Sequence, residues 1–260
     1  MIDPTTLDDH AFAVWAAERA GAVLLDVRAR AEADGLEGKA LKDAGDAAAQ
    51  AELDRILTEH RPGDSVLSEE AADDKSRLTS SRVWIIDPLD GTREFSEPPR
   101  DDWAVHVALW ERGAPGDGLT AGAVAQPALG ETFSTGQPRV VPQRTSDRPR
   151  IAVSRSRPPA FVEALAAELD AELVPMGSAG VKVMSVVRDI ADAYVHAGGQ
   201  YQWDNAAPVV VARAAGLHCS RVDGSPIVYN EDDTSLPDLI VCRPELAESI
   251  VEFVRRHGTS

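Results

Sequence analysis

The stretch from Val83 to Thr92 constrains the fold of this chain more than any other part of the sequence. It begins with a run of apolar residues, which is typical of a buried strand. The run ends at Asp87, and Pro88 fixes its own φ angle and restricts the preceding residue to extended geometry. We therefore expect the strand to end at Asp87 and the chain to turn, so that Asp90 comes back toward the same pocket.

Two carboxylates and the main-chain carbonyl of Leu89 at the end of this strand form a set of oxygen ligands. Hard cations such as Mg²⁺ prefer oxygen ligands. Taken alone, Asp90-Gly91 also fits an ordinary turn. A phosphatase that uses an aspartate nucleophile is excluded, because Pro88 occupies the position of that nucleophile, and the glycine-rich phosphate loop of nucleotide-binding proteins is absent from the sequence.

The composition is that of a globular protein, with 43% hydrophobic and 27% charged residues. The net charge of −17 argues against a nucleic-acid partner. No apolar run reaches the roughly 20 residues of a membrane span. No signal peptide is apparent after Met1, and Cys219 and Cys242 are the only two cysteines of the sequence. We therefore expect a cytoplasmic protein with two reduced cysteines and no membrane partner.

The polar segment 136–150 contains three prolines and four arginines and predicts a boundary between two domains, 1–140 and 150–260. In the first domain, hydrophobic spacing predicts an α+β arrangement with helices at 5–33 and at 46–60, where Asp46 is the N-cap, and strands at 65–69, 82–87, 102–110, 122–127 and 131–135. In the second, strands at 151–155, 172–176, 191–197 and 238–243 alternate with helices at 158–169, 178–188, 205–215 and 244–256, which indicates an α/β arrangement.

Further acidic residues stand where predicted elements begin or end. Glu69 ends a strand, Asp46 begins a helix, and Asp204 stands just before a helix of small residues. Hydrolysis of a phosphate monoester requires neutralised phosphoryl oxygens, an activated water and a stabilised leaving alkoxide, and two or three Mg²⁺ ions roughly 4 Å apart provide all three. A hydroxyl such as that of Thr92, held by an acidic partner, would orient the water. A helix that begins near Gly91 would direct free N–H groups at the phosphate.

Three separated motifs resemble those of the inositol monophosphatase family, which consists of Mg²⁺-dependent, lithium-sensitive phosphatases. They are Trp84–Thr92, Ser68-Glu69-Glu70 and Trp203-Asp204-x-Ala206-Ala207, and their order and spacing match over roughly residues 8–256. The resemblance implies a layered α/β/α/β/α sandwich. It also implies that Glu69, Asp87 and the Leu89 carbonyl hold one metal, that Asp87, Asp90 and Asp204 hold a second, that Asp46 holds a third ion or its water, and that Glu69 and Thr92 orient the attacking water.

Within the family, the sequence is most similar to the 3′(2′),5′-bisphosphate nucleotidases of sulfur metabolism, the CysQ type. The similar segments are Asp90–Phe95, Ser154–Arg157 and Gly177–Lys182. This resemblance implies hydrolysis of the 3′-phosphate of adenosine 3′,5′-bisphosphate to AMP, and of the sulfated relative of this nucleotide. It implies substrate contacts from Gly91, Thr92, Arg155, Arg157, Ser178, Lys182 and Trp203, in which the three cations bind a second phosphate.

Other interpretations remain open. Each of the three cations also fits a solvated surface charge, and Trp203 also fits a core residue. The same metal site would serve an inositol 1-phosphate or fructose 1,6-bisphosphate phosphatase, and a non-catalytic metal- or phosphate-sensing protein is a further alternative. Family members occur as monomers and as dimers, so we expect a monomer or a homodimer. Asp43 stands where the family usually has threonine, and Asp101-Asp102-Trp103 have no assigned role.

Overall fold

The computed structural model describes residues 3–31, 33–156 and 158–259. Two mixed sheets organise this part of the chain, with strand orders β1-β2-β3-β4-β5 and β7-β6-β8-β10-β9. The strands of the first sheet are β1 (Ser65–Ser68), β2 (Arg82–Asp90), β3 (Ala104–Glu111), β4 (Leu119–Gln126) and β5 (Glu131–Ser134). Those of the second are β6 (Arg150–Ser154), β7 (Glu172–Met176), β8 (Ala193–Ala197), β9 (His218–Ser220) and β10 (Asp238–Cys242).

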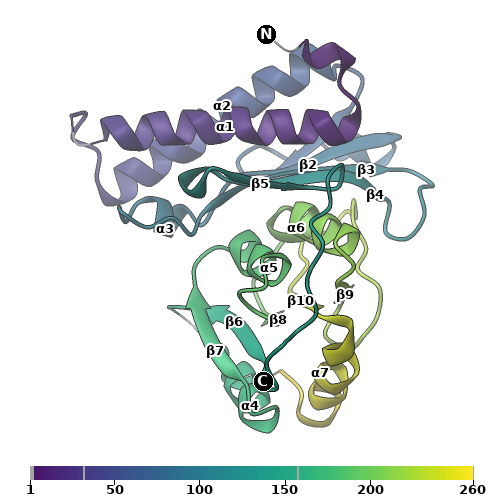
Figure 1. Cartoon of the computed structure of the whole chain (residues 1–260). Helices are drawn as coiled ribbons and strands as arrows, with labels where there is room; N and C mark the ends of the chain where they lie inside the picture. Colours follow the sequence, from purple (N-terminus) through teal and green to yellow (C-terminus); the bar gives the residue numbers. More distant parts are fainter. Residues whose placement is uncertain (1–2, 32, 157, 260) are drawn as a thin grey trace.

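The helices and the two sheets form five layers (Figure 1). α1 (Asp9–Arg30) and α2 (Gly38–His60) cover the outer face of the first sheet. α5 (Ala179–Val187) and α6 (Gln202–Ala214) lie between the two sheets, and α4 (Ala160–Glu168) and α7 (Pro244–His257) cover the far face of the second. The short α3 (Thr92–Phe95) follows β2 directly. This arrangement confirms the predicted α/β/α/β/α sandwich.

β2 is a continuous apolar run because both of its faces are buried. Val83 and Ile85 pack into the central layer, whereas Trp84 and Ile86 pack against the layer of α1 and α2. All four side chains are fully buried. Asp87 lies two residues after Ile85 on the same face of the strand, so it also points into the centre of the molecule.

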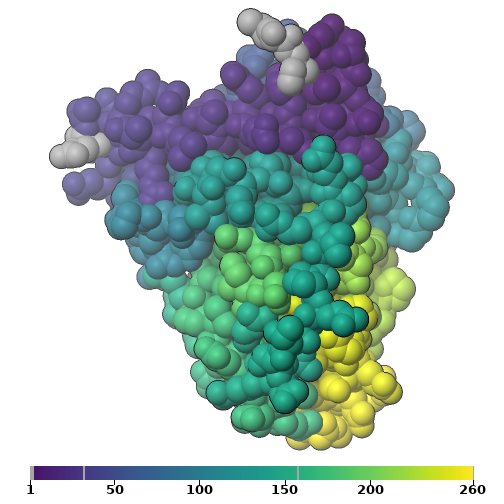
Figure 2. Space-filling view, viewed as in Figure 1, coloured from purple at the N-terminus to yellow at the C-terminus, as the bar shows by residue number. Residues whose placement is uncertain are grey.

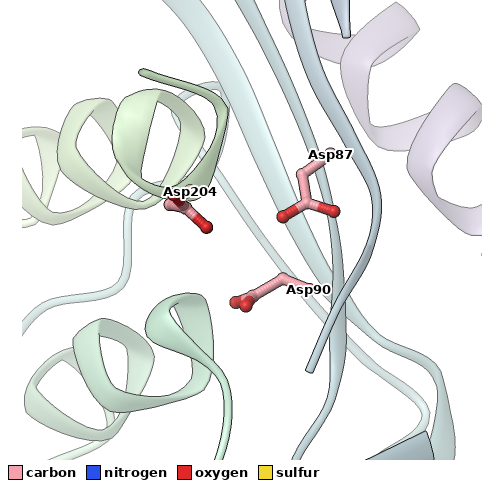
Figure 3. Close-up of side chains that lie close together, drawn as sticks. All are labelled: Asp87, Asp90 and Asp204. Carbon is pink, nitrogen blue, oxygen red and sulfur yellow. The ribbon is translucent and has the colours of Figure 1, made fainter. Parts of the chain in front are cut away.

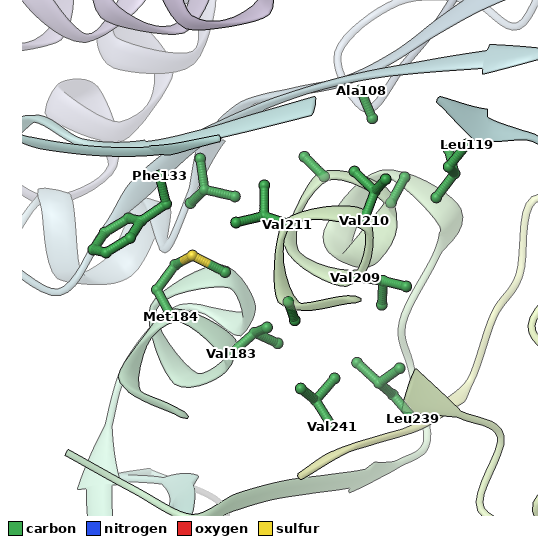
Figure 4. Packing of buried hydrophobic residues seen from close by; sticks show 14 of the residues in the cluster. Ala108, Leu119, Phe133, Val183, Met184, Val209, Val210, Val211, Leu239 and Val241 are labelled. Carbon is green, nitrogen blue, oxygen red and sulfur yellow. The ribbon is translucent and has the colours of Figure 1, made fainter. Parts of the chain in front are cut away.

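The helices of the central layer carry apolar side chains toward both sheets, because a sheet covers them on each side. Met184 of α5 and Val210 and Val211 of α6 lie on the side of the first sheet, near Phe133 and Ala108. On the opposite side, Val183 of α5 and Val209 of α6 face Leu239 and Val241 of β10 (Figure 4). Each fully buried side chain of this size contributes about 1.5–3 kcal/mol of transfer free energy. This layer positions α5 and α6 rigidly against β2 and β3.

The predicted start of the second helix was wrong. α2 begins at Gly38, and Asp46 lies in its interior and is not an N-cap. The segment 36–45 is rich in glycine and charged residues, a composition that favours a loop. Gly45 is a poor helix former and costs about 1 kcal/mol relative to alanine. Tertiary packing reverses this preference, since a Cβ atom at Gly45 would stand 2.6 Å from Cε1 of Phe95. The helix therefore tolerates glycine so that α3 can approach closely.

Smaller differences concern element ends. α1 begins at Asp9, not at residue 5, and β3 begins at Ala104, not at 102. α6 begins at Gln202, not at 205, and the three-residue β9 was not predicted. Cys219 and Cys242 are free, as expected. In the described residues, no helix combines the length and the apolar character needed to cross a bilayer.

The chain passes from the first sheet to the second between β5 and β6, and this crossing segment lies on the surface (Figure 2). All strands of one sheet lie before residue 135 and all strands of the other lie after 149. The division into domains 1–140 and 150–260 stays a prediction.

Candidate active site

Asp87 and Asp90 reach the same face of the first sheet because β2 contains a bulge. In a regular strand, residues three apart point to opposite faces. Here Asp87 pairs with His106 and Asp90 pairs with Ala104, so β2 has one residue more than β3 in this interval. Pro88 has no N–H for the ladder and favours such an irregularity. The strand pairing continues to Asp90 and does not end at Asp87 as expected, but both carboxylates meet as predicted.

The third carboxylate of the cluster comes from the central layer. Asp204 lies in the first turn of α6, not before the helix as expected, and its Oδ2 accepts a hydrogen bond of 2.6 Å from the Tyr201 N–H. One oxygen from each of Asp87, Asp90 and Asp204 lies within 4.8 Å of the other two. The three side chains point toward one another across the interface between β2 and α6 (Figure 3). This is the geometry of a cation site.

Asp90 is held by the start of α5. Its Oδ1 accepts a hydrogen bond from the Ala179 N–H (3.1 Å), and its Oδ2 accepts one from the Gly180 N–H (2.6 Å) and another from the Ser178 hydroxyl. Burial would raise the pKa of Asp90, but the charge of His106 and these hydrogen bonds outweigh burial and bring the pKa to about 2. Asp90 is therefore the ionised anchor of the cluster.

Asp87 and Asp204 each accept a backbone hydrogen bond, from Leu89 and Tyr201, but it does not offset the effect of burial. Burial raises the pKa of Asp87 well above its usual range, and the charges of Glu69 and Asp90 add to the effect. Burial and then the charge of Asp90 raise the pKa of Asp204 to about 7. Within the described residues, Asp87 Oδ2 is buried and has no hydrogen-bond partner. A divalent cation would satisfy this oxygen and neutralise the repulsion, so the donor set fits Mg²⁺.

Glu69 lies at the rim of the cluster. The residue reaches solvent, but its carboxyl group lies among protein atoms that raise its pKa to about 8, first through lost hydration and then through the charges of Asp204 and Asp90. A hydrogen bond between Glu69 and Asp87 offsets part of this rise. The structure thus brings Glu69 into electrostatic contact with the three aspartates, although it is not part of the tightest set.

Thr92 and Asp46 form a second pair beside the cluster. The Thr92 hydroxyl lies 3.1 Å from the Leu89 carbonyl oxygen and also has the Asp46 carboxylate within hydrogen-bonding reach. Burial, followed by the charges of Glu70 and Asp43, raises the pKa of Asp46 to about 7. A threonine hydroxyl with an acidic neighbour of this pKa is suited to orient a water molecule at neutral pH.

Gly91 joins β2 to α3 in a conformation that requires glycine. Its φ angle is +87°, in the left-handed region. A Cβ atom there would also stand 3.0 Å from the Ser178 Cβ and 3.2 Å from the Asp102 carbonyl oxygen. Glycine therefore allows β2, α5 and the segment before β3 to converge behind the carboxylates. Asp102 contributes to this junction, because its Oδ2 accepts a 2.6 Å hydrogen bond from the Gly177 N–H.

A cavity of about 220 Å³ opens beside the cluster. Asp90, Gly91 and Asp204 form one side of it, and Ser178, Lys182, Tyr194, His196 and Gln200 belong to the remaining wall. Lys182 is buried, its Nζ donates a hydrogen bond to the Ser178 carbonyl oxygen, and it lies 5.3 Å from the centre of the Tyr194 ring. Burial lowers the pKa of Lys182, and Asp90 and Glu94 counteract part of this effect.

The predicted cations differ in their availability. Arg155 donates through Nε to Glu94 (2.7 Å) and through Nη2 to Glu97 (2.6 Å), so a substrate phosphate must use the remaining nitrogen or displace Glu97. Arg157 lies outside the described residues. Trp203 is half-buried, packs against the central layer and stacks on Tyr201 at 4.9 Å.

His106 was not among the residues predicted from the sequence. It lies on β3 opposite Asp87 and is fully buried, and its ring contacts both Asp90 and the Trp203 carbonyl. The available signal was a single polar residue in the apolar run 103–110.

Comparison with known proteins agrees with this geometry. The model of the inositol monophosphatase family matches residues 7–259. A 3′-phosphoadenosine 5′-phosphate phosphatase of Mycobacterium tuberculosis is 52% identical over 235 residues, which cover 88% of this chain and 86% of that protein. The 3′(2′),5′-bisphosphate nucleotidase CysQ of Escherichia coli is 31% identical over 193 residues, covering 70% and 75% respectively.

The same fold occurs in solved structures. Inositol monophosphatase II of Staphylococcus aureus superposes with a TM-score of 0.76 at 20% identity, over 95% of this chain and 96% of that one. The sandwich, the carboxylate cluster and the match over nearly the whole sequence lead to one conclusion: this chain is a phosphatase that belongs to the inositol monophosphatase family.

Proposed function

We propose that this protein is a Mg²⁺-dependent phosphatase that hydrolyses the 3′-phosphate of adenosine 3′,5′-bisphosphate to give AMP and phosphate. One observation carries the proposal: two members of the carboxylate cluster, Asp90 and Asp204, line a cavity whose wall also includes the buried cation Lys182. The names of the relatives from M. tuberculosis and E. coli point to the same substrate class. The 3′-phosphate of the sulfated nucleotide is a second substrate in this proposal.

The site offers two kinds of positive charge, and each would contact a different phosphate of the substrate. The carboxylates attract cations, not phosphates, so the reacting phosphate requires bound Mg²⁺, which supplies charge neutralisation and a more acidic water. Lys182 is a buried cation in the wall of the same cavity and offers a direct cationic partner for a phosphate. A substrate with two phosphates uses both kinds of contact, whereas inositol 1-phosphate uses one.

In the proposed mechanism, the cations would be held by Asp87, Asp90, Asp204, Glu69 and the Leu89 carbonyl. Asp46 would hold the Thr92 hydroxyl through a hydrogen bond, and Thr92 with Glu69 would orient the attacking water toward phosphorus. The free N–H groups near Gly91 at the start of α3 face the phosphate. Ser178 and Lys182 bind the second phosphate. Arg155 assists through the guanidinium nitrogen that neither Glu94 nor Glu97 contacts. Trp203 lines the position of the nucleoside. Arg157 keeps its predicted role as a further phosphate contact.

Phosphate release from three substrates tests the proposal. Purified protein with Mg²⁺ is assayed with adenosine 3′,5′-bisphosphate, inositol 1-phosphate and fructose 1,6-bisphosphate. We expect the highest kcat/KM with the nucleotide and complete loss of activity with excess chelator. Equal or faster hydrolysis of inositol 1-phosphate contradicts the substrate assignment, and activity that survives exhaustive chelation contradicts the metal mechanism.

A substitution separates the two phosphate sites. Lys182→Met keeps most of the buried side-chain volume but removes the charge. We expect a much larger loss of kcat/KM for adenosine 3′,5′-bisphosphate than for a monophosphate such as 3′-AMP. Arg188→Met, which removes a charge from the end of α5 where Arg188 pairs with Glu131, serves as the matched control. An equal loss for both substrates would show that Lys182 is structural.

We also propose a cytoplasmic location, supported by the two free cysteines, and a monomeric or homodimeric state. Size-exclusion chromatography with light scattering distinguishes the two assemblies.

A further inference from the structure

His106 stands at the point where the first sheet meets the central helices. It lies on β3 between Ala104 and Ala108, on the face that packs into the central layer. Its neighbours on this face are apolar, and its own side chain is fully buried. A buried polar ring in such a position must find polar partners.

Its two ring nitrogens contact groups from two different elements. Nδ1 lies 3.2 Å from the Trp203 carbonyl oxygen, and because a carbonyl only accepts, Nδ1 is the donor in this hydrogen bond. Nε2 lies 3.2 Å from Oδ2 of Asp90, in a close polar contact rather than a well-aligned hydrogen bond. Asp87 Oδ2 is 3.9 Å from Nδ1.

The ring has little space to move. A Cβ atom at Gly180 would stand 2.0 Å from Nε2 and 2.8 Å from Cε1 of His106. The His106 ring is therefore confined between the backbone at the start of α5 and its own strand, β3. The same Gly180 donates its N–H to Asp90. Ring, helix start and carboxylate thus form one packed unit.

We propose that His106 is a positioning residue that sets the separation and orientation of Asp90 and Asp204. Asp90 belongs to the first sheet, whereas Asp204 belongs to a helix that packs between the sheets. The ring spans the distance between them: one nitrogen contacts the Asp90 carboxylate, and the other binds the carbonyl of the residue directly before Asp204. The inference rests on the proposed function, because Asp90 and Asp204 are ligands for the proposed Mg²⁺.

Loss of the ring would let the two carboxylates relax independently. Groups that orient metal ligands through a second contact change metal affinity by about 10–100-fold when they are removed. We therefore expect His106 to act on the affinity for the cation rather than on the stability of the metal-free fold.

Three variants separate its two contacts. His106→Asn retains a polar group near the Nδ1 position and can keep the Trp203 contact. His106→Gln extends a polar group toward the Nε2 position and can keep the Asp90 contact. His106→Leu removes both. Val105→Ala is the control, because Val105 is a buried neighbour on the same strand that faces the layer of α1 and α2.

Mg²⁺ binding by isothermal titration calorimetry without substrate is the primary measurement, and thermal unfolding in chelator is the second. We expect His106→Leu to raise the Mg²⁺ dissociation constant by about 10–100-fold, and Asn and Gln to give smaller increases. Val105→Ala should lower the unfolding temperature while its Mg²⁺ affinity stays unchanged.

The outcomes are distinct. If the wild-type protein binds Mg²⁺ and all three His106 variants bind it equally well, the positioning role is refuted and the proposed function stands. If Val105→Ala loses as much affinity as the His106 variants, the effect is one of general stability and the proposal fails. If the wild-type protein binds no Mg²⁺, the proposed function fails first, and the role of His106 fails with it. Should the leucine variant not fold, the asparagine and glutamine variants supply the same comparison.

Discussion

Replacing Asp90 with asparagine removes one negative charge from the centre of the site and hardly changes its shape. In the structure, both carboxylate oxygens of Asp90 accept hydrogen bonds from the start of α5. An amide offers one acceptor oxygen and one NH₂ group. In either orientation the NH₂ group opposes a buried N–H, that of Ala179 or that of Gly180.

The substitution has one cost in folding stability and another in catalytic rate, and the structure gives the size of each. One buried N–H without an acceptor costs about 1–3 kcal/mol, and relief of the repulsion with Asp87 and Asp204 offsets part of it in the metal-free protein. Removal of one member of a buried charge pair costs about 3–5 kcal/mol. Applied to the cation and the transition state that it stabilises, this loss corresponds to a decrease of roughly 10²–10⁴ in kcat/KM.

Steady-state phosphate release gives the rate, and urea unfolding in chelator gives the stability. Asp26→Asn is the control, since Asp26 is exposed on α1 and the substitution removes the same charge. We expect the control to match the wild type in both measurements. An Asp90→Asn protein that is folded and keeps more than about a tenth of the wild-type kcat/KM would refute the assignment of Asp90 as a metal ligand.

Three further predictions follow from burial and charge. The pKa values of Glu69 and Asp204 are raised to about 8 and about 7 in the folded protein. The stability that their protonated forms contribute is therefore fully present below pH 4, and it is lost as the pH rises through 7 and 8. The unfolding temperature of chelator-treated protein should therefore fall between pH 5 and pH 8, and saturating Mg²⁺ should reverse the fall; an unfolding temperature that rises with pH contradicts this. Met184→Ala, at a fully buried position in the central layer, should lower the free energy of unfolding by about 2–5 kcal/mol, whereas Val140→Ala, at a position that is 86% exposed, should change it by less than about 0.5 kcal/mol; urea titrations that rank them the other way refute the packing argument. Gly180→Ala should weaken Mg²⁺ binding despite the better helix propensity of alanine, because the new Cβ would collide with His106, and Gly63→Ala, with no atom within 4 Å of its Cβ, should not; equal affinities in calorimetry count against the close packing.

Local patterns predicted most of the elements. The apolar run of β2, the alternation of strands and helices after residue 150 and the separated acidic motifs are all readable along the chain. The failures are informative, because each one lies where a distant segment decides the local structure. α2 extends through Gly45 because Phe95 packs against it, and no pattern near residue 45 contains this information.

The candidate site shows the same division. Asp87, Asp90 and Asp204 were expected to converge, and the structure brings them within one cation's reach. The bulge that turns Asp90 to the same face as Asp87 is encoded locally by Pro88, although the pairing with β3 reveals it. Arg155 carries the residue type expected for phosphate binding, but two carboxylates from α3 and the segment after it already engage its guanidinium.

The order of residues along the chain was sufficient to indicate which side chains carry the chemistry, because chemical type and spacing near a strand end are local properties. Which of these side chains are paired or held in place depended on contacts between segments far apart in the chain, as between His106 and Trp203, which are 97 residues apart. Burial, desolvation and hydrogen-bond partners arise only when such segments pack together, and these quantities determine the pKa values and orientation of the carboxylates. For that reason the candidate ligands could be proposed from the sequence, whereas the proposed role of His106 required the folded molecule.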